Sequence, residues 1–286
     1  MLVAQTETPE QHRHLWWKEV LIIVSFYAVY TLIRNRFGSA RLADVGEPVH
    51  AFNNALRVIR FERAVGLFHE ESIQQHFLGH RTFIRFWNMY YGTAHFIVTI
   101  FAFVTVFKKA PAVFARYRNT LAFTTAFALI GFSLFPLMPP RLLDNPSHYG
   151  GRAIAEARNL HIFGFDDTME TVGGLWSFDS GTMSKVSNQY AAMPSLHTGW
   201  ATWCALALWP LLRRKWMRAL LVAYPLGTLF CIIVTGNHYW LDGVGGLVVL
   251  AAGFLAGDHL HNWNQRRLAR HRAHRAQQTA GAQNEW

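Results

Sequence analysis

The chain has 286 residues, of which 51% are hydrophobic, 15% aromatic and 15% charged. Soluble domains contain about 25% charged residues, so this composition excludes an ordinary soluble protein and indicates a membrane protein. The net charge of +10 could indicate a nucleic-acid partner, but the basic residues lie beside hydrophobic segments and form no separate basic domain. We therefore expect no nucleic acid, and Cys204 and Cys231 match no metal or redox pattern.

A membrane-spanning helix needs about 20 mostly apolar residues. Six windows meet this requirement, some with polar interruptions: about 16–37, 83–107, 117–138, 195–212, 217–235 and 238–261. The sequence predicts an all-α polytopic membrane protein with six transmembrane helices and amphipathic helices in its outer loops. We expect an N-terminal tail at 1–15, the membrane domain at 16–262 and a basic tail at 263–286.

Basic residues predict the orientation of this protein in the cell membrane. They are concentrated in the loops 108–118 and 213–218 and in the C-terminal tail, whereas the segments 38–82 and 139–194 are not net positive. By the positive-inside rule, both termini are expected in the cytoplasm and the two latter segments outside.

The outer segment 38–82 contains apolar residues at helical spacing. They are Val49, Phe52, Leu56, Ile59 and Val65. The pattern predicts either an amphipathic helix on the membrane surface or a helix packed over the bundle.

The third window ends in prolines that bring Arg141 to the outer surface. A guanidinium group suits bidentate phosphate binding, although an interfacial arginine that extends to water would follow the same pattern. The fourth window begins at Pro194-Ser195-Leu196-His197. Pro and Ser are typical of a helix start, whose N-terminus can bind phosphate. His197 would then be a cation or proton donor beside that anion.

The sixth window begins with His238, and Asp242 follows four residues later. On one helix face, the carboxylate can accept a hydrogen bond from one imidazole nitrogen and make the other more nucleophilic. Taken alone, the pair could also be a structural contact. The predicted topology, however, brings all three elements to the outer ends of spans three, four and six.

With these elements in this order, the chain resembles the type 2 phosphatidic acid phosphatase (PAP2) superfamily. The run 139–143 with 237–239 is similar to the branch that contains inositol phosphorylceramide synthases and their actinobacterial relatives. The resemblance implies no metal ion and no cofactor. It assigns the site residues as follows: His238 as the nucleophile that forms a phosphohistidine, Asp242 as its orienter, His197 as the acid for the leaving oxygen, and Arg141 with the Ser195 region as phosphate ligands.

The sequence departs from the phosphatase pattern at two positions, where Leu134 and Ile232 replace a lysine and an arginine. Phosphoryl transfer relies on positioned positive charge and hydrogen-bond donors, so other groups must supply them. We expect contributions from the following candidates: Lys185, Asn237, Tyr190, and His95 with Asn88 and Tyr91.

Three functions remain open at this point. The chain could be a phosphotransferase that passes a phospho-headgroup from a phospholipid to an alcohol such as inositol. It could be a phosphohydrolase that acts on a lipid phosphate or an isoprenoid diphosphate, with water as the acceptor. The third alternative is a non-catalytic protein that only binds membrane lipids and would tolerate the loss of His238.

Overall fold

The structure is a computed structural model that describes residues 47–160, 163–174 and 189–283, together with a few single positions before residue 47. Over these residues the chain is helical and forms no strand beyond an isolated bridge between Leu137 and Ala191. The helices are α3 (Glu47–Ala64), α4 (Glu70–Leu78), α5 (Arg81–Lys109), α6 (Pro111–Leu134), η2 (Pro140–Leu142), α7 (Arg152–Ala157), α8 (Thr168–Thr171), α10 (Leu196–Leu208), η3 (Trp209–Leu211), α11 (Lys215–Val234) and α12 (Trp240–Gln283). The expected tail 1–15 and most of the expected span 16–37 lie outside the described residues.

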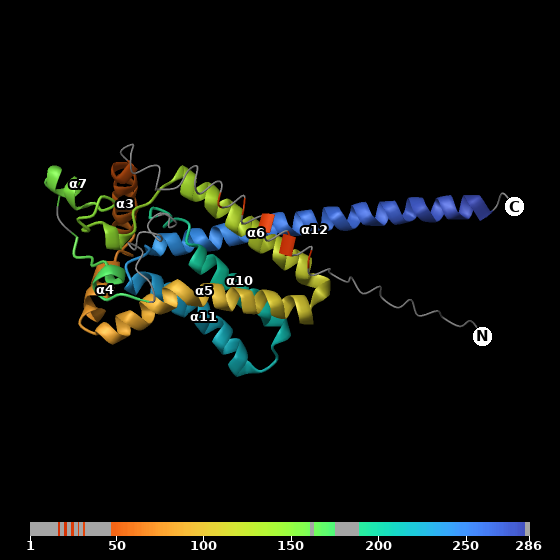
Figure 1. The fold of residues 1–286 in the computed structure, drawn as a ribbon, viewed down its shortest axis with the longest axis horizontal. Coiled ribbons are helices and arrows are strands. Elements are labelled where there is room, and N and C mark those ends of the chain that lie inside the picture. The colour runs from red at the N-terminus through yellow and green to blue at the C-terminus, as the bar shows by residue number, and fades with distance from the viewer. Residues whose placement is uncertain are drawn as a thin grey trace.

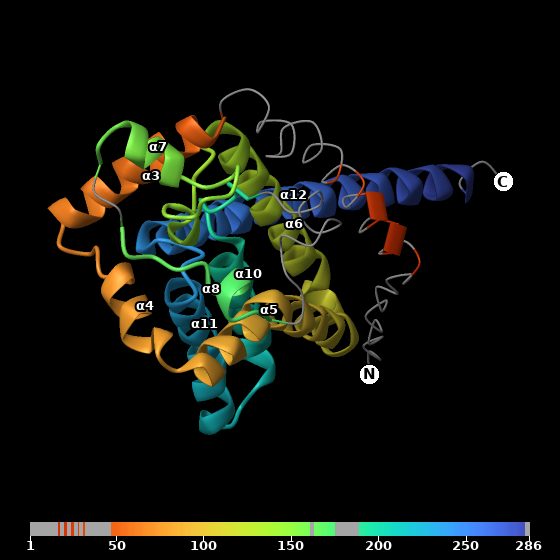
Figure 2. The ribbon, with the colours of Figure 1, turned by 60° about the vertical axis from the view of Figure 1, so that its left-hand side comes forward.

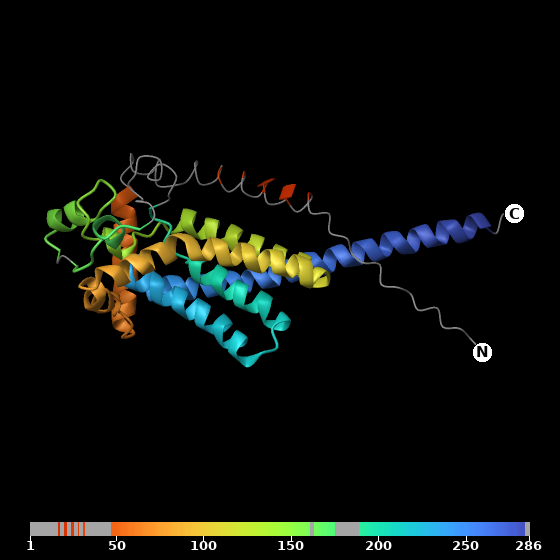
Figure 3. The same ribbon diagram turned by 60° about the horizontal axis from the view of Figure 1, so that its bottom comes forward.

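Helices α5, α6, α10, α11 and α12 lie side by side as a bundle (Figures 1 and 3). Helix α10 contacts all four of the others, and α12 packs along α6. The two helices approach closely, since a Cβ added at Gly257 would lie 2.9 Å from the backbone nitrogen of Thr120. Arg116 of α6 forms an ion pair with Asp258 of α12. Beyond the bundle α12 continues as one helix, so no break marks the expected boundary at residue 263 (Figure 1).

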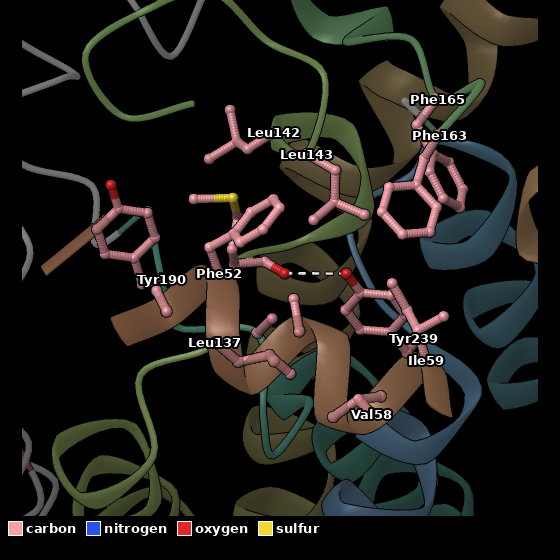
Figure 4. Packing of buried hydrophobic residues seen from close by; sticks show 14 of the residues in the cluster. Phe52, Val58, Ile59, Leu137, Leu142, Leu143, Phe163, Phe165, Tyr190 and Tyr239 are labelled. Atoms are coloured by element: carbon pink, nitrogen blue, oxygen red, sulfur yellow. Dashed lines mark hydrogen bonds between the residues drawn. The ribbon is translucent and has the colours of Figure 1, made fainter. Parts of the chain in front are cut away.

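A cap formed by helices α3, α4 and α7 covers one end of the bundle (Figures 1 and 2). Its core contains buried side chains of α3, of the segment after α6 and of the turn before α12. Phe52, Ile59, Leu143 and Tyr239 are each at most 2% exposed (Figure 4). The Tyr239 hydroxyl donates to the Met138 carbonyl at 3.1 Å. Helix α3 therefore packs over the bundle, which is the second of the two arrangements expected for the segment 38–82.

Within the part of the chain that the structure describes, three helices are long and apolar enough to cross a membrane, where the sequence predicted six for the whole chain. They are α5, α11 and residues Trp240–His271 of α12. Helix α10 has 13 residues, which at 1.5 Å per residue is about 20 Å, less than the roughly 30 Å of a bilayer core. In α6, Arg118, Asn119 and several threonines lower the hydropathy of the expected window 117–138. The prediction that the windows 117–138 and 195–212 are membrane spans is therefore wrong by the length and composition of their helices.

The bundle carries an apolar outer surface. Ile97 of α5 is 65% exposed, Leu226 of α11 is 61% exposed and Leu255 of α12 is 75% exposed. Soluble monomers rarely expose such large contiguous apolar areas, because water makes them costly. The bundle therefore has the surface of a membrane protein.

Candidate active site

His238 and Asp242 lie where α11 passes into α12. Gly236 has φ +66°, a left-handed conformation that glycine adopts readily, and this turn leaves His238 two residues before the first residue of α12. The sequence predicted both residues within one helix, and this detail is corrected. The four-residue spacing still brings His238 Nδ1 within 3.2 Å of Asp242 Oδ2. The same carboxylate oxygen accepts the Tyr239 amide at 2.9 Å, which fixes its position.

This contact determines which imidazole nitrogen is available for chemistry. A carboxylate only accepts hydrogen bonds, so Nδ1 of His238 carries the proton and Nε2 carries the lone pair. His238 is 3% exposed and Asp242 is fully buried. The second oxygen of Asp242, Oδ1, has no hydrogen-bond partner among the described residues. The arrangement suits a nucleophilic nitrogen with an orienting carboxylate behind it.

Ser195 caps the start of α10 and connects it to α12. Its hydroxyl accepts from the Thr198 amide at 3.4 Å, and its own amide donates to the Asp242 carbonyl at 2.8 Å. A Cβ added at Gly246 of α12 would collide with the Ser195 carbonyl oxygen. The capping role expected of Ser195 is thus present, and the close approach at Gly246 positions the start of α10 against the start of α12.

Three imidazole rings converge beside this junction. The His197 ring centroid lies 5.7 Å from that of His238 and 4.3 Å from that of His95. Tyr91 stacks on His197 at 4.3 Å, and its carbonyl lies 3.0 Å from His95 Nδ1. Nε2 of His197 is buried and has no hydrogen-bond partner among the described residues. The structure therefore brings together the predicted site residues of α5, α10 and the start of α12.

Arg141 also reaches the site, but its guanidinium is engaged by protein acceptors. Nε donates to Asn237 Oδ1 at 3.0 Å, Nη1 to Asp167 Oδ2 at 2.5 Å and Nη2 to Gln189 Oε1 at 2.6 Å. Its amide donates to the Gly236 carbonyl at 2.8 Å, which ties the segment around Arg141 to the turn before α12. The residue is 6% exposed. Arg141 is thus part of a buried polar network.

The network assigns a structural contact to Asn237 and reveals two residues that the sequence did not single out. Asn237 accepts from Arg141 and donates to Thr235 Oγ1 at 2.8 Å, so it bridges the turn before α12. Asp167 and Gln189 belong to none of the three sequence elements and lie 26 and 48 residues from Arg141 in sequence. No local spacing pattern could have indicated them.

The remaining candidates are placed elsewhere or lie outside the described residues. Tyr190 belongs to the core of the cap, where its hydroxyl donates to the Tyr149 carbonyl at 3.0 Å (Figure 4). Asn88 donates to the Thr168 carbonyl at 2.7 Å and holds α8 against α5. Lys185 falls within 175–188, outside the described residues. The structure thus does not bring Tyr190 to the histidines.

Among the described residues, no group of three or more His, Cys, Asp and Glu side chains could hold a metal ion.

In the loop after η2, burial raises the pKa of Asp144 to about 6, although its carboxylate accepts the Phe163 and Phe165 amides at 3.1 and 3.3 Å. This carboxyl group organises the cap beside the site.

Comparison with known proteins gives two matches of different scope. The sequence model of the PAP2 superfamily matches residues 56–256, more than half of the chain. The chain is also 25% identical over 173 residues to the inositol phosphorylceramide synthase catalytic subunit aur1 of Schizosaccharomyces pombe, a match that covers 59% of this chain and 39% of that protein. The chain therefore spans about two fifths of the length of this relative. No solved structure matches this chain. Neither match concerns actinobacterial proteins, so that part of the expectation stays a prediction.

Proposed function

Because the chain belongs to the PAP2 superfamily, whose members are phosphatases and phosphotransferases, we propose that it transfers phosphoryl groups of membrane lipids through a phosphohistidine on His238. The observation that carries the proposal is the contact of 3.2 Å between His238 Nδ1 and Asp242, with the His197 ring centroid 5.7 Å from that of His238. This is the arrangement of nucleophile, orienter and proton donor that a two-step displacement requires.

In the first half-reaction, His238 Nε2 attacks the phosphorus and the bond from phosphorus to the leaving oxygen breaks. The leaving oxygen takes a proton from protonated His197, whose Nε2 has no partner among the described residues. Asp242 holds the Nδ1 proton and stabilises the positive charge that develops on the imidazole. In the second half-reaction, His197 takes the proton of the incoming hydroxyl as its oxygen attacks phosphorus and the P–N bond breaks.

We favour an alcohol over water as the acceptor, and inositol is our first candidate. The relative in Schizosaccharomyces pombe is named an inositol phosphorylceramide synthase subunit. At the two positions where phosphatases carry cations, Leu134 is 76% exposed on the outer surface of the bundle and Ile232 is fully buried. Neither supplies charge to the phosphate. Hydrolysis of a lipid phosphate or an isoprenoid diphosphate is the alternative outcome, and a protein that only binds lipid is the third.

We further propose that the bundle crosses the cell membrane several times, with the site at the outer face and both termini in the cytoplasm. The cap and the site lie at one end of the bundle, whereas α12 continues from the other (Figure 1). Lys108 and Lys109 end α5 at the end remote from the cap, and Lys215 begins α11 there. Basic residues at that end are what the positive-inside rule requires of the cytoplasmic side.

The test compares wild type with His238→Ala on a phospholipid and a lipid phosphate in detergent, with and without inositol. His259→Ala is the matched control, because His259 is exposed on α12 away from the site. We expect a phosphodiester product that requires inositol and His238, and a covalent phosphoenzyme that is stable in alkali and labile in acid. Free phosphate that requires His238 would support the hydrolase. Equal turnover by His238→Ala and wild type would exclude the catalytic proposal.

A further inference from the structure

Two fully buried glutamates, one from each of two cap helices, meet the start of α12. Glu62 of α3 accepts the Leu241 amide on Oε1 at 2.7 Å, and Glu70 of α4 accepts the Trp240 amide on Oε1 at 3.1 Å. Trp240 and Leu241 are the first two residues of α12. Amides in the first turn of a helix lack intrahelical acceptors, and carboxyl groups stabilise that end. The cap helices therefore hold the start of α12 through side chains.

The other oxygens of these carboxyl groups indicate a shared proton. Glu62 Oε2 and Glu70 Oε2 are both buried and accept no hydrogen bond from a described donor. The amides that the two Oε1 atoms accept belong to consecutive residues, so the two carboxyl groups lie side by side. A proton between the two Oε2 atoms would give each of them a partner, whereas two ionised carboxylates have no proton to share. Burial, followed by the hydrogen bond and the charge of Glu70, raises the pKa of Glu62 to about 9.

We propose that Glu62 and Glu70 share one proton between their Oε2 atoms and act as positioning residues that hold the first turn of α12, and with it Asp242 and His238, in the geometry of the site. The amides that they bind, those of Trp240 and Leu241, lie between His238 and Asp242 in the chain. A displacement of this turn changes the contact between the imidazole and the carboxylate directly. The effect on turnover rests on the proposed function, whereas the shared proton does not.

The charges around the pair explain why the proton is retained. Asp242 in the first turn of α12 and Tyr239 just before it interact electrostatically with both carboxyl groups, and Asp144 in the loop after η2 interacts with Tyr239. His238 contacts Asp242 from the other side through its Nδ1 proton. With the proton lost, the carboxylates of Glu62, Glu70 and Asp242 would lie together in a buried region, where like charges repel strongly. We expect the start of α12 to shift when the pair ionises.

The sign of the pH dependence follows from the raised pKa of Glu62. Between its ordinary value of 4.5 and about 9, the folded protein keeps a proton that the unfolded chain has released. Stability from this group is therefore complete below about pH 4.5 and is lost as the pH rises towards 9. Turnover should fall roughly twofold by pH 9 and about tenfold by pH 10 relative to pH 7, as the protonated fraction falls.

Glu62→Gln is the informative variant, because an amide can accept the Leu241 amide and donate to Glu70 without a titratable proton. Thermal unfolding and kcat are measured from pH 6 to 10 in detergent for wild type, Glu62→Gln, Glu62→Ala and Glu70→Gln. Glu156→Gln is the control, since Glu156 is exposed on α7. As the pH rises above 8, we expect Tm and kcat to decrease less in both Gln variants than in wild type, and we expect the control to behave like wild type. We expect Glu62→Ala to lose at least tenfold in kcat at pH 7 with little change in KM.

Equal losses of Tm and kcat with rising pH in wild type and both Gln variants would overturn the proposal, whether or not Glu62→Ala folds. The unfolding curves also separate this proposal from the proposed function. If His238→Ala leaves turnover unchanged, the phosphohistidine proposal fails, while the difference in pH dependence of Tm between wild type and Glu62→Gln still decides for or against the shared proton.

Discussion

The ion pair between Arg141 and Asp167 gives a quantitative test of the polar network. The two side chains are 7% and 4% exposed, and their contact is 2.5 Å. In Asp167→Asn the guanidinium keeps a neutral acceptor but loses its countercharge. Removing one partner of a buried ion pair costs about 3–5 kcal/mol, because a charge remains buried without compensation. The low exposure of both groups places the expected loss within this range.

The free energy of unfolding is measured by denaturant titration of the purified protein in detergent, and Asp166→Asn serves as the control. Asp166 is only partly buried and accepts from Thr171 Oγ1 at 2.7 Å, so its substitution should cost less than about 1 kcal/mol. Phosphate should stabilise Asp167→Asn more than wild type, because the anion replaces the lost carboxylate beside Arg141. A loss below about 1 kcal/mol in Asp167→Asn, with no added response to phosphate, would refute the assignment of Asp167 as the counterion.

Two further predictions concern His197 and the approach of α10 to α12. His197→Ala should lower kcat about 10²–10⁴-fold when the leaving group is a lipid alkoxide. The loss should be much smaller with a nitrophenyl phosphate, because its leaving group needs no proton. Equal losses for the two substrates in initial-rate assays would contradict a role of His197 in protonation. Gly246→Ala should destabilise the protein by about 1–3 kcal/mol through overpacking and should lower kcat. Gly227→Ala should do neither, because nothing lies within 4 Å of its added Cβ. If unfolding titrations and kcat do not separate the two variants, the segment around the Ser195 carbonyl moves to accept the added methyl group.

The parts of the site that sequence could predict are those encoded by local spacing. His238 and Asp242 meet because they are four residues apart, and Ser195 caps α10 because serine follows a proline at a helix start. The common location of the three motifs followed from the expected topology, and it is present although two of the expected spans are corrected. The order of the three elements along the chain was therefore sufficient to predict that His238, His197 and Arg141 lie at one end of the bundle.

The parts that sequence could not predict depend on pairings across long distances in the chain. Asp167 reaches Arg141 over 26 residues, and Glu62 reaches Leu241 over 179. No periodicity relates such positions, and a buried carboxyl group looks the same in sequence as a solvated one. Tyr190 was expected near the substrate because tyrosine can donate, but its ring packs in the core of the cap. The chemistry of a residue type predicts its capability, whereas its burial decides its partners.

The charge of the site bears on which phosphate group it receives. Asp167 neutralises Arg141, and Leu134 and Ile232 supply no cation, so the described part of the site offers little positive charge to a phosphate. A phosphodiester carries one negative charge and a phosphomonoester carries up to two, and the energetic cost of an uncompensated charge in a buried site is large. We therefore expect wild type to favour a phosphodiester donor, as headgroup transfer between lipids requires. Asp167→Asn restores one positive charge and should shift the ratio of kcat/KM towards monoesters; an unchanged ratio would mean that the charge of Arg141 does not reach the phosphate.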